Sequence, residues 1–323
     1  MRLALSSSLS LSLSVSLLAC SGPTGPLERL TIPKGASFAA VTDSLAAHGL
    51  IRWRPWFTLV GRVGGFERAI KPGIYQFAPG TPALGVLRDL RDGKYLTIKV
   101  TIPEGFTLID IAARLADSLG VPPDSVLAVA RDPALTKASH VEAPSLEGYL
   151  APDTYTLPAH SSAREAVAAM AAQFLAGWKD DLDARARAQG LTRHQVVTLA
   201  SIVEGEAAVE EERAVIAAVY RNRLRIRMPL QADPTVQYAI QLATGARKPR
   251  LFNRDYRYPS PYNTYLIAGL PPGPVGAPSR ASIEAVLAPA DVPYLYFVGT
   301  GDGRHLFSRT YQEHLRAISR TRR

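Results

Sequence analysis

The sequence of 323 residues is poor in cysteine, since Cys20 is its only one. A single cysteine excludes an internal disulfide, so the fold cannot depend on covalent cross-links. The six histidines are scattered, without the paired spacing of zinc hydrolases, and we therefore expect no metal site. The phosphate-binding glycine loops and the G-x-S-x-G elbow of serine hydrolases are also missing. The sequence thus gives no reason to expect a cofactor or a serine nucleophile.

Beyond the first nineteen residues the chain has no apolar run long enough to span a membrane. Residues 1–19 begin with Arg2, continue as a stretch of Leu, Ser and Val, and lead into "LLAC". This is the layout of a secretory signal peptide, and its end resembles a bacterial lipobox in which Cys20 becomes lipidated. We interpret residues 1–19 as a lipoprotein signal and 20–29 as a tether, with an uncleaved signal anchor as the alternative. Either anchor predicts a membrane-anchored chain facing the periplasm or cell wall.

The charge balance is basic, with a formal net charge of +9 and a pI near 9.7. Such a charge favours an anionic partner or a solvated basic surface. The basic C-terminal residues lack the interleaved aromatic residues of grooves that bind single-stranded nucleic acid. We therefore expect no nucleic acid partner.

An internal repeat organises the first part of the chain. "TIPKGASFAAVTDSLAAHGLI" begins at Thr31, and "TIPEGFTLIDIAARLADSLGV" begins at Thr101. Each copy predicts a short strand, a Pro-x-Gly turn, a hydroxyl N-cap and an amphipathic helix that ends at a glycine. Between them the sequence predicts a strand within 72–80 and a helix over 83–93. We expect both copies to form one N-terminal module over 30–142.

Longer helices and then irregular loops follow. The pattern predicts helices within 163–190, over 192–206 and near 279–287, and a strand over 293–299. Together these elements predict an α+β fold with a small βα module followed by a larger mixed domain over 143–323.

Two glutamates end the helix predicted over 192–206. At about 100° per residue, Glu206 lies roughly 20° from Leu199 and inside the apolar arc, whereas Glu204 lies roughly 140° away. Glu206 should therefore face the protein interior or a cleft, and Glu204 should face water or support its neighbour. Because burial disfavours the charged form, Glu206 should have the raised pKa that a general acid requires.

Polar and aromatic residues on loops are further candidates. They are Gln231 and Asp233 in "LQADPTVQYAI", Tyr262, Asn263 and Tyr265 in "SPYNTYLIAGLPPGPVGAP", and Glu147, Asp153 and Tyr155 in "EGYLAPDTY". Aromatic rings beside amides and carboxylates suit sugars, which offer apolar faces and hydroxyl edges. Each residue type is also common in turns for structural reasons alone.

These motifs, together with "LASIVEGEA" and "PYLYFVGTGDGRHLFS", occur in an order and spacing that resemble the endolytic murein transglycosylase (YceG-like) family. The resemblance covers about residues 30–315 and implies a LysM-like N-terminal module and a C-terminal catalytic domain. It implies cleavage of the MurNAc-β-1,4-GlcNAc bond within peptidoglycan glycan strands, leaving a 1,6-anhydroMurNAc end. It also implies that Glu206, the second glutamate of the I-[VI]-E-x-E motif, is essential.

The implied mechanism needs only one carboxyl group. The 6-hydroxyl of MurNAc attacks its own C1, so Glu206 can first act as acid and then as base, whereas a hydrolase usually needs two carboxyls. The other candidate residues would position sugar or hold Glu206. Nascent strands, whose elongation would be terminated, and peptidoglycan synthases are the further partners that this function implies.

The chain departs from the family in two features. A lipobox-like segment stands where members commonly have a membrane-spanning helix, and Gly205 stands where a larger residue is usual. Two alternatives stay open. One is a muramidase-type hydrolase with Glu206 as acid and Asp233 or Glu204 as the second carboxyl. The other is a non-catalytic peptidoglycan-binding lipoprotein.

Overall fold

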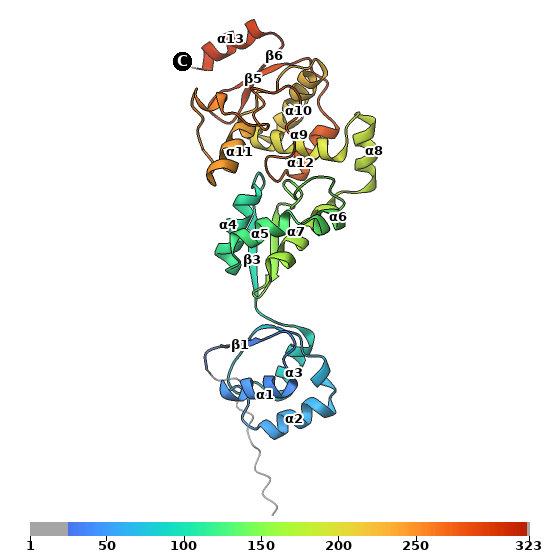
Figure 1. The fold of residues 1–323 in the computed structure, drawn as a ribbon, viewed down its shortest axis with the longest axis vertical. Helices are drawn as coiled ribbons and strands as arrows, with labels where there is room; N and C mark the ends of the chain where they lie inside the picture. The colour runs from blue at the N-terminus through green and yellow to red at the C-terminus, as the bar shows by residue number, and fades with distance from the viewer. Residues whose placement is uncertain (1–24, 322–323) are drawn as a thin grey trace, which may run out of the picture. The chain divides into compact units, whose positions relative to one another are not determined.

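The structure is a computed structural model that describes residues 25–321. It is built from helices and short antiparallel strand pairs, which confirms the α+β class (Figure 1). Two compact units divide between Leu96 and Thr97. The predicted signal peptide and Cys20 lie outside the described residues.

The smaller unit is a two-stranded sheet with three helices. Its elements are β1 (Glu28–Ile32), α1 (Phe38–Ala47), α2 (Arg54–Val63), η1 (Phe66–Arg68), β2 (Gly73–Phe77) and α3 (Ala83–Asp92). Strands β1 and β2 are antiparallel, with Leu30 opposite Tyr75. Their buried side chains form one apolar core with Leu45, Phe57 and Leu87 from the helices. The likeness of this unit to LysM modules stays a prediction.

The larger unit holds the remaining elements. They are β3 (Thr97–Ile102), α4 (Leu108–Leu119), α5 (Pro123–Ala130), α6 (Pro133–Ala138), β4 (Asp153–Pro158), α7 (Ala163–Gly177), α8 (Asp180–Ala188), α9 (Arg193–Glu206), α10 (Glu210–Arg225), α11 (Asp233–Thr244), η2 (Asp255–Arg257), α12 (Arg280–Leu287), β5 (Tyr296–Gly299), β6 (His305–Ser308) and α13 (Tyr311–Thr321). Strand β3 pairs antiparallel with β4, and β5 pairs antiparallel with β6.

The internal repeat is confirmed as local structure. Each copy is a strand followed by a helix whose N-cap hydroxyl, from Ser37 or Thr107, accepts a hydrogen bond from the backbone three residues later. The two copies do not form one module, however. β1 pairs with β2 in the smaller unit, and β3 pairs with β4 in the larger unit.

The division of the chain therefore differs from the predicted boundary at 142/143. Val100, Leu115 and Val126 belong to the same apolar core as Val196 and Leu199, which places residues 97–142 in the larger unit. The repeat predicts local conformation correctly because caps and turns are local. It does not predict the partner strand, because that choice depends on distant apolar residues.

Helix α9 is central to the larger unit. It begins with a capping box, in which Thr192 and Gln195 satisfy each other's backbone N–H groups. All residues from Val196 to Val203 are buried, and α9 packs against α8, α10, α11 and α12 (Figure 1). The helix therefore holds whatever follows Val203 at a fixed place. Within residues 25–321, no helix is both long and apolar enough to cross a membrane.

Candidate active site

Glu206 is the last residue of α9, and its side chain lines a cavity of about 350 Å³. Helix α10 contributes Tyr220 and Arg223 to the lining, and the segment before α11 contributes Gln231 and Asp233. Tyr265, the β5–β6 hairpin and α13 complete it. The helical-wheel prediction for Glu206 is therefore confirmed, since the half-buried carboxyl faces a cavity in the protein.

The surroundings of Glu206 favour its protonated form. Burial, and secondly the negative charge of Asp233, raise the pKa of the Glu206 carboxyl to about 7. The Tyr220 hydroxyl, which donates to Oε1 at 3.0 Å, the backbone N–H of Asp233 and the charge of Arg223 act in the opposite direction. A carboxyl group that still carries its proton near neutral pH can act as a general acid.

Asp233 is held by two tyrosines. The Tyr265 hydroxyl donates to Oδ1 at 2.6 Å, and the Tyr256 hydroxyl donates to Oδ2 at 3.2 Å. The two rings lie against each other, with centroids 4.6 Å apart. Because each oxygen accepts a hydroxyl, the orientation of the Asp233 carboxyl group beside Glu206 is fixed.

Arg223 supplies a buried positive charge at the cavity wall. Its guanidinium donates to the carbonyls of Leu295 and Leu230, both at 2.7 Å, and more weakly to that of Pro229. It lies over the ring of Tyr296. Among the described residues no carboxylate forms an ion pair with it. Its charge therefore acts on the cavity without a bound counter-ion from the chain.

The β5–β6 hairpin forms another wall. Phe297 packs edge-on against Tyr220, with ring centroids 5.8 Å apart, and His305 lies edge-on to Phe297. Glu212 fixes His305 by accepting from its backbone N–H at 3.1 Å and contacting Nδ1 at 2.7 Å. These contacts connect the hairpin to the start of α10.

The turn before α11 is strained. Gln231 has a positive φ of 50°, which is uncommon outside glycine, and its side chain is exposed at the cavity. Thr264 holds the turn, since its carbonyl accepts from the Gln231 N–H at 3.1 Å and its hydroxyl accepts from the Ala232 N–H at 3.0 Å. The turn directs Gln231 and Asp233 to the same cavity as Glu206.

Gly205 lies against the first turn of α11. A Cβ atom at this position would lie 2.6 Å from Cγ and 2.8 Å from Cβ of Pro234, closer than such atoms can approach. The absence of a side chain therefore allows the end of α9 and the start of α11 to meet at Glu206 and Asp233.

Glu204 faces away from this cavity, and its mostly covered side chain has a different set of partners. Its Oε2 accepts from the Ser279 backbone N–H and the Ser282 hydroxyl, both at 2.8 Å, and from the Ser279 hydroxyl. Its Oε1 lies 3.3 Å from Nη1 of Arg213. Glu204 does not face water; it stabilises the start of α12 and neutralises a buried arginine.

The residues of "EGYLAPDTY" are not brought to the cavity. Glu147 is buried and accepts from the backbone N–H of Leu108, at the start of α4, and from the Tyr238 hydroxyl at 2.9 Å. Burial raises its pKa to about 7 as well. Asp153 is exposed on β4, and Tyr155 is buried with its hydroxyl on the carbonyl of Ala151.

Two loop residues also have structural positions. Asn263 is fully buried, where its amide donates to the carbonyls of Tyr256 and Tyr258 and its oxygen accepts from the Tyr265 N–H. It thereby orients both tyrosines that hold Asp233. Tyr262 packs edge-on against Tyr238, outside the cavity lining.

Several cavity residues were missed by the sequence reasoning, namely Tyr220, Arg223, Phe297 and His314. Tyr256, which lies outside the lining and donates to Asp233, was missed as well. Tyr220 and Arg223 could have been found, because they lie three residues apart on one face of α10, the helix that follows the glutamate pair. The others come from distant segments and carry no local signal. Within residues 25–321, no group of three or more His, Cys, Asp or Glu side chains could hold a metal ion.

We predict that Glu204→Gln destabilises the fold by about 3 kcal/mol, because it leaves the buried Arg213 without its inner counter-charge. The matched control is Glu210→Gln, which removes the outer partner of the same arginine. The Glu210 side chain is 67% exposed, against 9% for Glu204, so this change should cost less than about 1 kcal/mol. Urea titration measures both changes, and equal losses would contradict the structural role of Glu204.

Comparison with known proteins agrees with the resemblance found in the sequence. The sequence pattern of the YceG-like family matches residues 30–320. A Bacillus subtilis protein named endolytic murein transglycosylase is 31% identical over 307 residues, which cover 89% of this chain and 83% of the relative. A Streptococcus pneumoniae protein of the same name is 28% identical, and the match covers 57% of its length.

A solved structure is also similar. The crystal structure of a yceG-like protein from Listeria monocytogenes superposes with a TM-score of 0.62 at 31% identity. The match covers 91% of this chain and 99% of that one. The resemblance read from the five motifs is thereby confirmed: this chain belongs to the YceG-like family.

Proposed function

We propose that this chain is a peptidoglycan lytic transglycosylase that cleaves the MurNAc-β-1,4-GlcNAc bond within glycan strands. One observation carries the proposal: Glu206 faces a cavity and has a pKa raised to about 7. The relatives named endolytic murein transglycosylase support the same substrate and reaction class. No cofactor is needed for this chemistry.

In the proposed first step, Glu206 donates its proton to the glycosidic oxygen. The bond between C1 of MurNAc and O4 of GlcNAc then breaks, and positive charge develops at C1. Asp233 lies beside Glu206 and supports this step in two ways. Its charge helps keep Glu206 protonated before the reaction, and it stabilises the positive charge that develops during it.

In the second step, the MurNAc 6-hydroxyl attacks C1 and forms the 1,6-anhydro ring. Glu206, now ionised, takes the proton of that hydroxyl and returns to its starting form. The Tyr220 hydroxyl and the backbone N–H of Asp233 stabilise the ionised carboxylate between the two steps. Atoms balance without water, so one carboxyl group is sufficient.

A muramidase-type hydrolase is the second candidate, because Glu206 and Asp233 line the same cavity. Both oxygens of Asp233 already accept tyrosine hydroxyls, which makes this carboxylate a poorer base or nucleophile. The bonding therefore favours the transglycosylase. Product ends distinguish the candidates, since hydrolysis leaves reducing ends and transglycosylation leaves anhydro ends.

The proposal extends to the place of action. We infer that the chain is exported, is anchored through Cys20 or an uncleaved signal, and faces the periplasm or cell wall. There it would act on nascent strands as a terminator of elongation, beside peptidoglycan synthases. Gln231 and Tyr265, which line the cavity, are the candidates for sugar contact.

We expect Glu206→Gln to abolish the release of 1,6-anhydro products, with a loss of at least about 10³-fold in rate, because glutamine can neither donate nor accept the proton. The fold should remain, since glutamine has the same size. Purified glycan strands incubated with each protein and examined by mass spectrometry provide the measurement. Full turnover by the variant would exclude Glu206 as the acid.

The pH profile supplies a second prediction. Because Glu206 must be protonated to act as acid, kcat/KM should fall as the pH rises through about 7. Asp233→Asn removes a negative charge that raises this pKa, so the alkaline limb should move to lower pH. Glu211→Gln, an exposed carboxylate on α10, should leave the limb in place. An unmoved limb in Asp233→Asn would show that the two carboxyls are not coupled.

The anchor can be tested on the whole chain. Cells that express it and are fed radioactive palmitate should label the wild type and not Cys20→Ser, because only a thiol at that position can start the lipid modification. An unlabelled wild type that still sediments with membranes would favour the signal anchor instead.

A further inference from the structure

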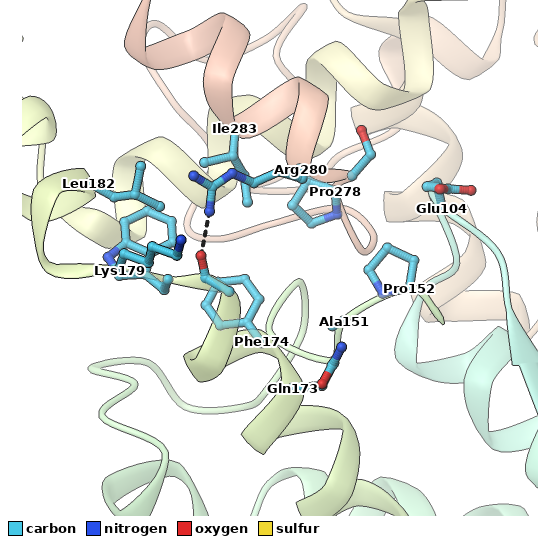
Figure 2. Close-up of a pocket in the computed structure, with 13 residues that line it drawn as sticks. Glu104, Ala151, Pro152, Gln173, Phe174, Lys179, Leu182, Pro278, Arg280 and Ile283 are labelled. Carbon is cyan, nitrogen blue, oxygen red and sulfur yellow. Dashed lines mark hydrogen bonds between the residues drawn. The ribbon is translucent and has the colours of Figure 1, made fainter. Parts of the chain in front are cut away.

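A second cavity, of about 420 Å³, lies within the larger unit. It is enclosed by the end of α7, the start of α12 and the turn after β3 (Figure 2). It shares no lining residue with the cavity of Glu206. None of the roles described so far uses it as a site.

The middle of this cavity is apolar but offers little to a sugar. Small apolar groups come from Ala151, Pro152, Pro278 and Ile283. The Trp178 ring is already engaged, because Phe174 stacks on it at 5.8 Å and the Arg193 guanidinium lies 5.2 Å from its centroid. Sugars bind through open aromatic faces, whereas methyl-sized side chains need only small apolar surfaces such as these.

Charged groups of both signs stand along the cavity. Glu104 lies at one end, Lys179 at the other, and Arg280 between them (Figure 2). Glu104 and Lys179 are both exposed to solvent. The Arg280 charge is already paired, because Glu284 accepts from its Nε at 2.8 Å and its Nη2 at 2.5 Å, and the carbonyl of Gly177 accepts from Nη1. This arrangement complements a ligand that carries a carboxylate and an ammonium group some distance apart.

A hydrogen bond links the cavity to the helix that carries Glu206. Ser279 lines the cavity and donates its backbone N–H to Glu204 at 2.8 Å, two residues before Glu206 on α9. The cavity therefore contacts the same helix as the proposed reaction site, on a different face of α9 from Glu206.

We propose that this cavity binds the stem peptide that peptidoglycan strands carry on MurNAc, a short peptide of alanine, glutamate and a diamino acid. Lys179 receives a carboxylate of the peptide, Glu104 receives the ammonium group, and the apolar middle receives the alanine methyl groups. The inference rests on the proposed function, since that function brings such a peptide to the protein.

The test measures binding without glycan and without cleavage. The synthetic tripeptide L-Ala-γ-D-Glu-L-Lys is titrated calorimetrically into the full chain. Lys179→Ala and Glu104→Gln should each weaken its binding by roughly tenfold or more, because each removes one charge-assisted contact. Lys137→Ala, which removes an exposed lysine on α6 away from the cavity, is the matched control and should bind as the wild type does.

Two outcomes would overturn the proposal. One is the absence of saturable binding at millimolar peptide, and the other is equal affinity in the wild type and both cavity variants. Displacement of the peptide by a peptide-free GlcNAc tetramer would overturn the ligand class. Because no step depends on cleavage, loss of the transglycosylase assignment would show in the product analysis and not in these titrations.

Discussion

The larger unit depends on one constraint: a carboxyl group must be held out of bulk water next to a second carboxylate. Burial and the charge of Asp233 both raise the pKa of Glu206. The hydroxyl of Tyr220 and the charge of Arg223 lower it. The balance leaves the pKa near 7, where the proton can leave and return at little cost. Moving any of these groups would shift this pKa, so the packing of α9, α10 and α11 sets the acidity of Glu206. The buried stretch of α9 from Val196 to Val203 fixes that geometry.

Two glutamates on one helix end show how position decides the role of a side chain. Glu204 faces the start of α12, where hydroxyl and backbone donors and Arg213 satisfy its charge. Glu206 faces a cavity, where fewer donors reach it and its proton is retained. Glu147 has a similarly raised pKa but does not line the cavity of Glu206. Its carboxyl group accepts hydrogen bonds from the N–H of Leu108 and the hydroxyl of Tyr238. A perturbed pKa is therefore informative only together with access for a substrate.

The sequence predicts the local structure well and the long-range arrangement only in part. The Thr192 cap, the apolar stripe of α9 and the inward direction of Glu206 follow from periodicity alone, and the structure has each of them. The repeat likewise predicts two capped βα elements correctly. Strand pairing is different, because β3 selects β4 through side chains more than fifty residues away. For the same reason Tyr256, which holds Asp233, could not be assigned from its neighbours in the chain.

The absence of a side chain at Gly205 determines how closely α9 and α11 approach each other. The ring of Pro234 occupies the space where a Cβ would stand, so the distance between α9 and α11 is limited by backbone thickness at this point. This contact sets the spacing of the Glu206 and Asp233 carboxyl groups, and therefore the strength of their electrostatic interaction. Residues 205 and 234 are therefore expected to vary as a pair among related chains: a larger residue at one place requires a retreat at the other. A chain that changed only one of them would keep every polar group of the site but weaken the interaction by which Asp233 raises the pKa of Glu206.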